Sequence, residues 1–173
     1  MGHDIKIKAH LPFIGKTGYA SHARNLFTAL NKLTTVKIRN FTCGDKWSGN
    51  TVNQHDQESY VTDEHKSMLV EQTLYNNSEK GRGEYLIYAG KDGDILESPD
   101  IHIVLGDNYH FYFFDEYNGP KIAYNVWETT RYQDDFFEQL LTFDQMWVPT
   151  NWSRNNLIEQ GYPAERVKVV PEG

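Results

Sequence analysis

The sequence contains a single cysteine, Cys43, so it can form neither an internal disulfide nor a cysteine-rich zinc site. It has no apolar run of the roughly eighteen residues that a membrane-spanning helix needs, and Met1–Lys8 does not resemble a signal peptide. Basic residues are also few, with 17 Lys and Arg against 24 Asp and Glu, which gives a formal net charge of −7. Nucleic acids and anionic membranes both attract cationic surfaces, so this balance disfavours either as the main partner. We therefore expect a cytoplasmic protein.

The sequence does contain enough apolar material for a folded core. Its 173 residues are 39% apolar and 14% aromatic, which excludes a disordered chain. A chain of this length fits one domain of ordinary size, so we expect residues 1–173 to form a single domain.

Short apolar segments alternate with helical patterns along most of the chain. Strands are predicted at Ile5–His10, Val36–Phe41, Tyr85–Ala89, Ile101–Leu105, Ile122–Trp127, Gln145–Val148 and Val167–Val170. Helices are predicted at Tyr19–Lys32, Asp63–Tyr75, Gln133–Leu141 and Asn151–Gln160, with a long exposed loop at Thr42–Thr62. Alternating strands and helices predict an α/β fold: a doubly wound, mostly parallel, Rossmann-like sheet.

Three local patterns sharpen this prediction. The first helix carries an apolar stripe of Tyr19, Ala23, Leu26, Leu30 and Leu33. For the last helix, Thr150 can cap the start, and Gly161 can adopt the left-handed conformation after the end. Trp147 and Trp152 are interpreted as packing residues.

Two motifs suggest ligand chemistry. Gly15-Lys16-Thr17 lies where a phosphate-binding P-loop would end, but His10 occupies the position of its first glycine. Gly15 and Gly18 could still let the backbone approach a ligand closely, although a plain strand–helix turn explains them equally well. Asp92 and Asp94 have the D-x-D spacing of some metal-dependent sugar transferases, but ordinary turn chemistry is the favoured interpretation, and no metal site is predicted.

Residues 121–173 carry the most specific pattern. They read K-I-A-Y-N-V-W-E-T-T, then F-D-Q-M-W-V-P-T and a helix that ends in Gly161, then V-K-V-V-P-E-G. Their order and spacing resemble the second half of the N-terminal domain of GT-B glycosyltransferases, in particular retaining family 4. The front of the chain resembles the glycine-rich loop and first helix of that family at Gly15, Gly18, Tyr19, Arg24, Asn25 and Leu26. Residues 42–97 carry none of the resemblance, and Trp127-Glu128 stands where many members have a histidine.

The resemblance implies an acceptor-side domain that acts in transferring a hexose, with retention, from a nucleotide-sugar donor to a sugar or glycan acceptor. In that family a second domain holds most of the donor, and this chain stops where that domain would begin. We therefore expect the chain alone to be inactive, with no cofactor beyond the nucleotide-sugar substrate. Two alternatives stay open: a non-catalytic module that binds carbohydrate or docks on a partner, and a metal-dependent transferase that uses Asp92 and Asp94.

The candidate cleft residues follow predicted strands at their carboxyl ends, where doubly wound sheets bind ligands. They are Gly15, Thr17, Gly18, Asn108, Tyr109, His110, Trp127 and Glu128. For Glu128 the structural alternative is a favourable charge at a helix start. For Trp127 it is a place in the core. No catalytic residue is assigned.

Overall fold

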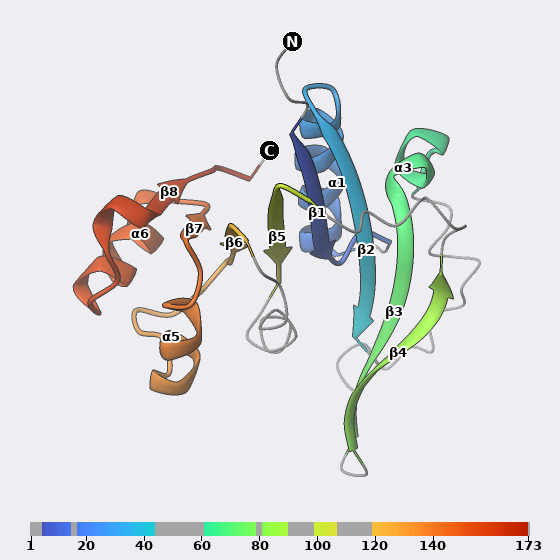
Figure 1. Ribbon diagram of the computed structural model, residues 1–173. Helices are drawn as coiled ribbons and strands as arrows, with labels where there is room; N and C mark the ends of the chain where they lie inside the picture. The colour runs from blue at the N-terminus through green and yellow to red at the C-terminus, as the bar shows by residue number, and fades with distance from the viewer. Residues whose placement is uncertain are drawn as a thin grey trace. The chain divides into compact units, whose positions relative to one another are not determined.

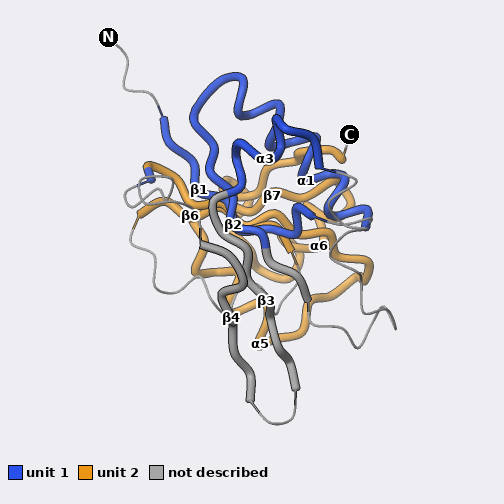
Figure 2. The backbone as a smooth tube through the Cα atoms, turned by 90° about the vertical axis from the view of Figure 1, so that its right-hand side faces the viewer, with its two compact units in different colours: residues 1–99 blue, residues 100–173 orange. Residues whose placement is uncertain are grey.

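The computed structural model describes residues 5–14, 17–43, 61–78, 81–89, 99–106 and 119–172 (Figure 1). The chain divides into two compact units, Met1–Pro99 and Asp100–Gly173, which are coloured separately in Figure 2. Both contain helices as well as strands, and the α/β, doubly wound, mostly parallel and Rossmann-like class expected from the sequence is confirmed.

In the described residues of the first unit, the strands lie in the order β4-β3-β2-β1. Its elements are β1 (Lys6–Leu11), α1 (Gly18–Asn31), β2 (Thr35–Cys43), α3 (Asp63–Met68), β3 (Leu69–Ser78) and β4 (Gly81–Ala89). β1, β2 and β3 are parallel, whereas β4 returns antiparallel to β3 as a hairpin (Figure 1).

Two predictions for this unit are wrong. The helix expected at Asp63–Tyr75 ends at Met68, because the following residues pair with β2 as strand β3. The apolar stripe of α1 is also displaced: Ala20, Ala23 and Phe27 are buried, while Leu33 lies beyond the helix and is 82% exposed. The two small alanines lie on the buried face with Phe27, and β1 contributes Ala9 and Leu11 to the buried core.

In the part of the second unit that the structure describes, parallel strands lie in the order β5-β6-β7-β8. Its elements are β5 (Ile101–Leu105), β6 (Lys121–Tyr124), α5 (Asp134–Leu140), β7 (Gln145–Val148), α6 (Asn151–Glu159), the 3-10 helix η2 (Ala164–Arg166) and β8 (Val167–Val169). The strand predicted at Ile122–Trp127 is shorter than expected, since β6 ends at Tyr124.

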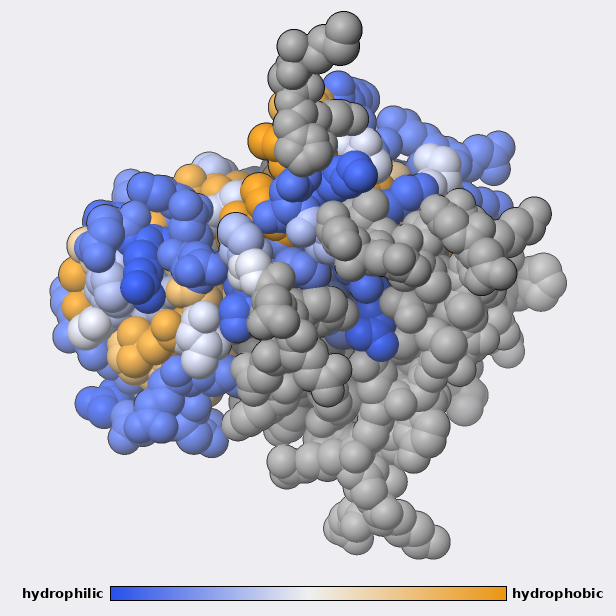
Figure 3. All heavy atoms as spheres, viewed as in Figure 1, coloured by the Kyte–Doolittle hydropathy of each residue, from blue (hydrophilic) through white to orange (hydrophobic). Residues whose placement is uncertain are grey.

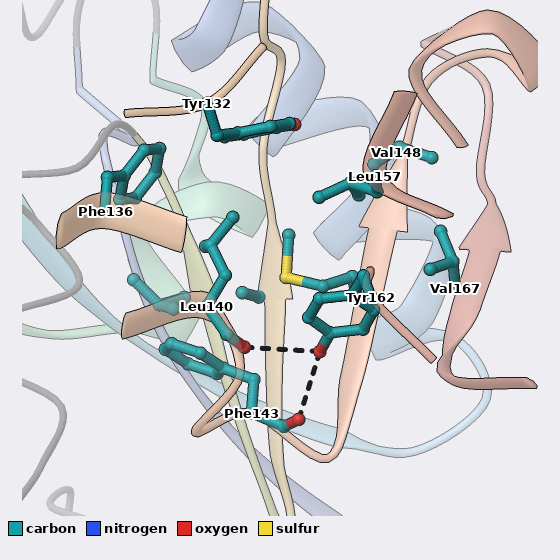
Figure 4. Close-up of a cluster of buried hydrophobic side chains, with 11 residues drawn as sticks. Tyr132, Phe136, Leu140, Phe143, Val148, Leu157, Tyr162 and Val167 are labelled. Carbon is teal, nitrogen blue, oxygen red and sulfur yellow. Dashed lines mark hydrogen bonds between the residues drawn. The ribbon is translucent and has the colours of Figure 1, made fainter. Parts of the chain in front are cut away.

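An apolar cluster fills the second unit and joins its strands to α5 and α6 (Figure 4). Val104, Ala123, Met146, Val148 and Val167 come from the strands, and Tyr132, Phe136, Leu140, Phe143, Leu157 and Tyr162 cover them. The hydroxyl of Tyr162 lies 3.2 Å from the carbonyl oxygen of Leu140 and 3.1 Å from that of Phe143. Burial accordingly raises the pKa of Tyr162 to about 12.

Both predicted ends of α6 are confirmed. The Thr150 hydroxyl accepts a hydrogen bond from the Ser153 amide at 3.1 Å, and Gly161 has a left-handed φ of 109°. The prediction for Trp152 is wrong, because this residue of α6 is 49% exposed. On the face drawn in Figure 3, the second unit is mostly hydrophilic with scattered apolar areas. Within the described ranges, the helices are too short or too polar to cross a bilayer.

Candidate functional site

The structure describes four of the eight predicted cleft residues. Thr17 and Gly18 belong to the first unit, and Trp127 and Glu128 belong to the second. Gly15, Asn108, Tyr109 and His110 lie outside the described residues, as do Asp92 and Asp94.

In the first unit, Thr17 caps α1. Its hydroxyl accepts a hydrogen bond from the Ala20 amide at 3.2 Å, which satisfies one of the free amides at the helix start. Gly18 is the first residue of α1, and a methyl group added to it would meet nothing within 4 Å. The packing of the described residues does not require glycine at this position.

The backbone before this cap is held by buried polar side chains that sequence reasoning missed. The Oδ1 atom of Asn40, on β2, accepts the amides of Phe13 and Ile14 at 2.7 and 2.9 Å. The Arg24 guanidinium, on α1, donates to the Phe13 carbonyl at 2.7 Å. Asn40 is fully buried, and burial also lowers the pKa of Arg24. The turn after β1 thus has its polar backbone groups bonded from two neighbouring elements.

A histidine on α3 lies against the same turn. The rings of His65 and Phe13 meet edge to face with centroids 5.5 Å apart. His65 also forms a capping box with Thr62: the Thr62 amide donates to Nδ1 at 3.0 Å, and the Thr62 hydroxyl accepts the His65 amide at 3.3 Å. Burial, and then the charge of Arg24, lower the pKa of His65. The neutral ring that accepts from Thr62 is therefore the favoured form.

In the second unit, Trp127 lies on a loop, residues 125–132, that leaves the carboxyl end of β6. Its indole stacks on the Tyr132 ring with centroids 4.8 Å apart and planes 14° apart. It also contacts Phe136 at 5.4 Å with the planes tilted by 50°. The indole N–H donates to the Arg131 carbonyl at 3.1 Å. This bond restricts rotation of the ring within its own plane, and the stack restricts its tilt. Trp127 is half-buried at the rim of the apolar cluster rather than within it.

Glu128 follows Trp127 on the same loop and is exposed. The alternative interpretation of Glu128 as a charge at a helix start does not apply, because α5 begins six positions later at Asp134. Arg131, the basic residue of the loop, pairs with Asp134 at 2.8 Å instead. Among the described residues, no hydrogen bond or ion pair occupies the Glu128 carboxylate. Both of its oxygens are thus without a donor from the part of the chain that the structure describes.

The 125–132 loop is held in place by Asn125, which sequence reasoning also missed. Asn125 is fully buried, and its amide group donates to the Gly106 carbonyl, after β5, at 2.8 Å. Its Oδ1 accepts the Tyr132 hydroxyl at 3.3 Å. An asparagine directly after a buried strand is a signal that could have identified this position from the sequence.

The described residues contain no group of three or more His, Cys, Asp or Glu placed to hold a metal ion. No protein-family model matches the chain, and no curated protein matches its sequence.

Proposed function

We propose that this chain is the acceptor-side domain of a retaining, metal-independent glycosyltransferase that moves a hexose from a nucleotide-sugar to a sugar or glycan acceptor. The proposal starts from the resemblance of residues 121–173 to family 4. It rests on one observation: an indole and a carboxylate without a partner among the described residues, Trp127 and Glu128, are adjacent just beyond the carboxyl end of a parallel strand. Ligands of Rossmann-like sheets bind beyond that end.

Among the described residues, the ring contacts of Trp127 do not lie on both faces of its indole. Tyr132 covers one face, and Phe136 lies only 5.7 Å from Tyr132. Since each ring contact spans roughly 5 Å, two rings on opposite faces of the indole would lie roughly 10 Å apart. Phe136 therefore lies on the Tyr132 side or at the edge. The described residues make no other ring contact with Trp127.

This combination suits one face of a pyranose. The indole N–H is occupied by Arg131, so Trp127 can offer a ligand an apolar face but no hydrogen-bond donor from its ring. The C–H face of a hexopyranose packs on such a surface, and the hydroxyls at its edge are donors for a carboxylate. A ligand with its own negative charge would be repelled by Glu128, which favours a neutral sugar at this position.

The test is binding of neutral methyl hexopyranosides to the full chain, measured by saturation-transfer NMR. Trp127→Ala removes a ring contact of roughly 0.5–1.5 kcal/mol, and Glu128→Gln removes a charged acceptor whose hydrogen bond contributes roughly 1.5–3 kcal/mol. We expect both variants to bind at least several-fold more weakly than the parent. Trp152→Ala is the matched control, because that indole is exposed on α6. Equal binding by the parent, Trp127→Ala and Glu128→Gln would contradict the proposal.

A further inference from the structure

Gln160 lies at the end of α6, and its side chain is bonded to the backbone of a residue far away in sequence. The Tyr132 amide donates to its Oε1 at 2.9 Å, and its Nε2 donates to the Tyr132 carbonyl at 2.8 Å. Helix termination does not need this side chain, because the Gln160 amide itself bonds to Asn156 and Gly161 supplies the left-handed stop. The glutamine amide thus serves the 125–132 loop rather than the helix that carries it.

The ring of Tyr132 is fixed by a second set of hydrogen bonds. Its hydroxyl donates to Oδ1 of Asn125, whose own amide group donates to the Gly106 carbonyl. The Asn125 backbone amide bonds to the Trp147 carbonyl at 3.1 Å, which anchors this residue to the sheet. Tyr132 is therefore held by its backbone at Gln160 and by its hydroxyl at Asn125.

Tyr132 in turn carries the indole of Trp127. Residues 125–132 belong to neither a helix nor a strand, so no regular backbone pattern determines the direction of Trp127. That direction comes from the stack on Tyr132 and from the bond to the Arg131 carbonyl, which also accepts the Thr129 hydroxyl at 2.9 Å. Among the described residues, no hydrogen bond joins Gln160 to Trp127 or Glu128 directly.

We infer that Asn125, Tyr132 and Gln160 are positioning residues, which set the orientation of the Trp127–Glu128 pair without contacting the ligand. The inference rests on the proposed function, because it names the groups that prepare that same site. Pre-organised supporting contacts matter because a displacement of about 1 Å at a site can cost up to about a hundredfold in rate.

Gln160→Met tests the inference, since it keeps the length of the side chain and removes both hydrogen bonds to Tyr132. Gln160→Glu keeps the acceptor for the Tyr132 amide and removes the donor, so its effects should be intermediate. Gln133→Met is the matched control: Gln133 is adjacent to Tyr132 and exposed, and its side chain makes no cap bond to α5.

Three measurements on the full chain separate positioning from stability. The Trp127–Tyr132 stack is followed by near-ultraviolet circular dichroism, with Trp127→Phe identifying its signal. Exchange of the Tyr132 amide is followed by hydrogen–deuterium exchange. Binding uses the same methyl hexopyranosides. In Gln160→Met at a temperature where it is fully folded, we expect a reduced stack signal, amide exchange at least about tenfold faster, and sugar binding about tenfold weaker.

The outcomes are distinct. One outcome is that Gln160→Met melts at a lower temperature but keeps the parent's stack signal and sugar binding. In that case Gln160 only stabilises the fold, and the inference is overturned. The same holds if Gln133→Met changes the stack and the binding as much as Gln160→Met does. If the parent binds no hexopyranoside, the proposed function fails, whereas the circular dichroism and exchange results still decide whether Gln160 orients Trp127.

Discussion

Asn40→Ala should be among the most damaging substitutions in the first unit. The Asn40 side chain has no exposed surface, and its Oδ1 is the acceptor for two consecutive backbone amides, those of Phe13 and Ile14. Alanine would leave both amides without that acceptor in a buried turn. A buried donor that loses its partner costs about 1–3 kcal/mol, so two cost about 2–6 kcal/mol before the turn relaxes. Domains of ordinary size have a total stability of about 5–15 kcal/mol.

Urea unfolding measures this effect, with Asn31→Ala as the matched control. Asn31 ends α1, and its Oδ1 accepts a single amide, that of Val36, at 3.1 Å in a partly buried position. We expect Asn31→Ala to lower the free energy of unfolding by about 0.5–1.5 kcal/mol, and Asn40→Ala by about 3–4 kcal/mol at an unchanged slope with urea. A cost below about 1 kcal/mol for Asn40→Ala, or equal costs for the two variants, would refute the reasoning.

Three further predictions concern His65, Tyr162 and the glycines at two helix ends. The folded-state pKa of His65 lies below its usual value of about 6.5, so the unfolded state binds the proton first as the pH falls. The free energy of unfolding should therefore fall as the pH drops below about 6.5. Urea titrations from pH 7 to 5 should show a weaker fall for His65→Gln than for the parent. Tyr162→Phe should lower the free energy of unfolding, measured by thermal melting, by about 1–2 kcal/mol. In ultraviolet absorbance it should also remove the tyrosine that titrates near pH 12. An unchanged alkaline titration would contradict the burial of the Tyr162 hydroxyl. Gly161→Ala should lower the free energy of unfolding by about 1–2 kcal/mol, because Gly161 has a left-handed φ. Gly18→Ala should leave the free energy of unfolding unchanged or raise it by up to about 1 kcal/mol. Equal melting temperatures for the two variants would show that the left-handed φ of Gly161 does not affect stability.

The parts of the fold that the sequence predicts correctly depend on local chemistry. Thr150 and Gly161 bound α6 through contacts within a few residues, so their roles can be recognised without knowing the rest of the chain. The buried strand Ile101–Leu105 is similarly evident, since it is a short, mostly apolar run and has the predicted bounds. Local preference also agrees with the observed α/β class.

The errors occur where pairing with another segment decides the outcome. Residues 69–75 contain apolar residues that fit a helix, but pairing with β2 makes them a strand. On α1, the choice between a stripe that includes Leu26 and one that includes Phe27 depends on which face meets the sheet, and a helical wheel with apolar residues on adjacent faces does not determine this. Trp152 has a large apolar side chain, which favours burial, but it lies in the first turn of α6 and is exposed.

The side chains that hold the backbone of the candidate site could not be predicted for a different reason. Asn40 and Gln160 each bond the backbone of a residue 27 or 28 positions away, and no spacing in the sequence marks such a contact. Both serve backbone that has just left a strand or precedes a helix, where regular pairing has ended but partial burial continues. Unbonded polar groups there would be costly, so side-chain amides from a neighbouring element supply the missing partners. The same bonds fix the shape of these turns. At these two turns, the residues that would prepare a ligand site are therefore side-chain amides of a neighbouring element, Asn40 on β2 and Gln160 at the end of α6.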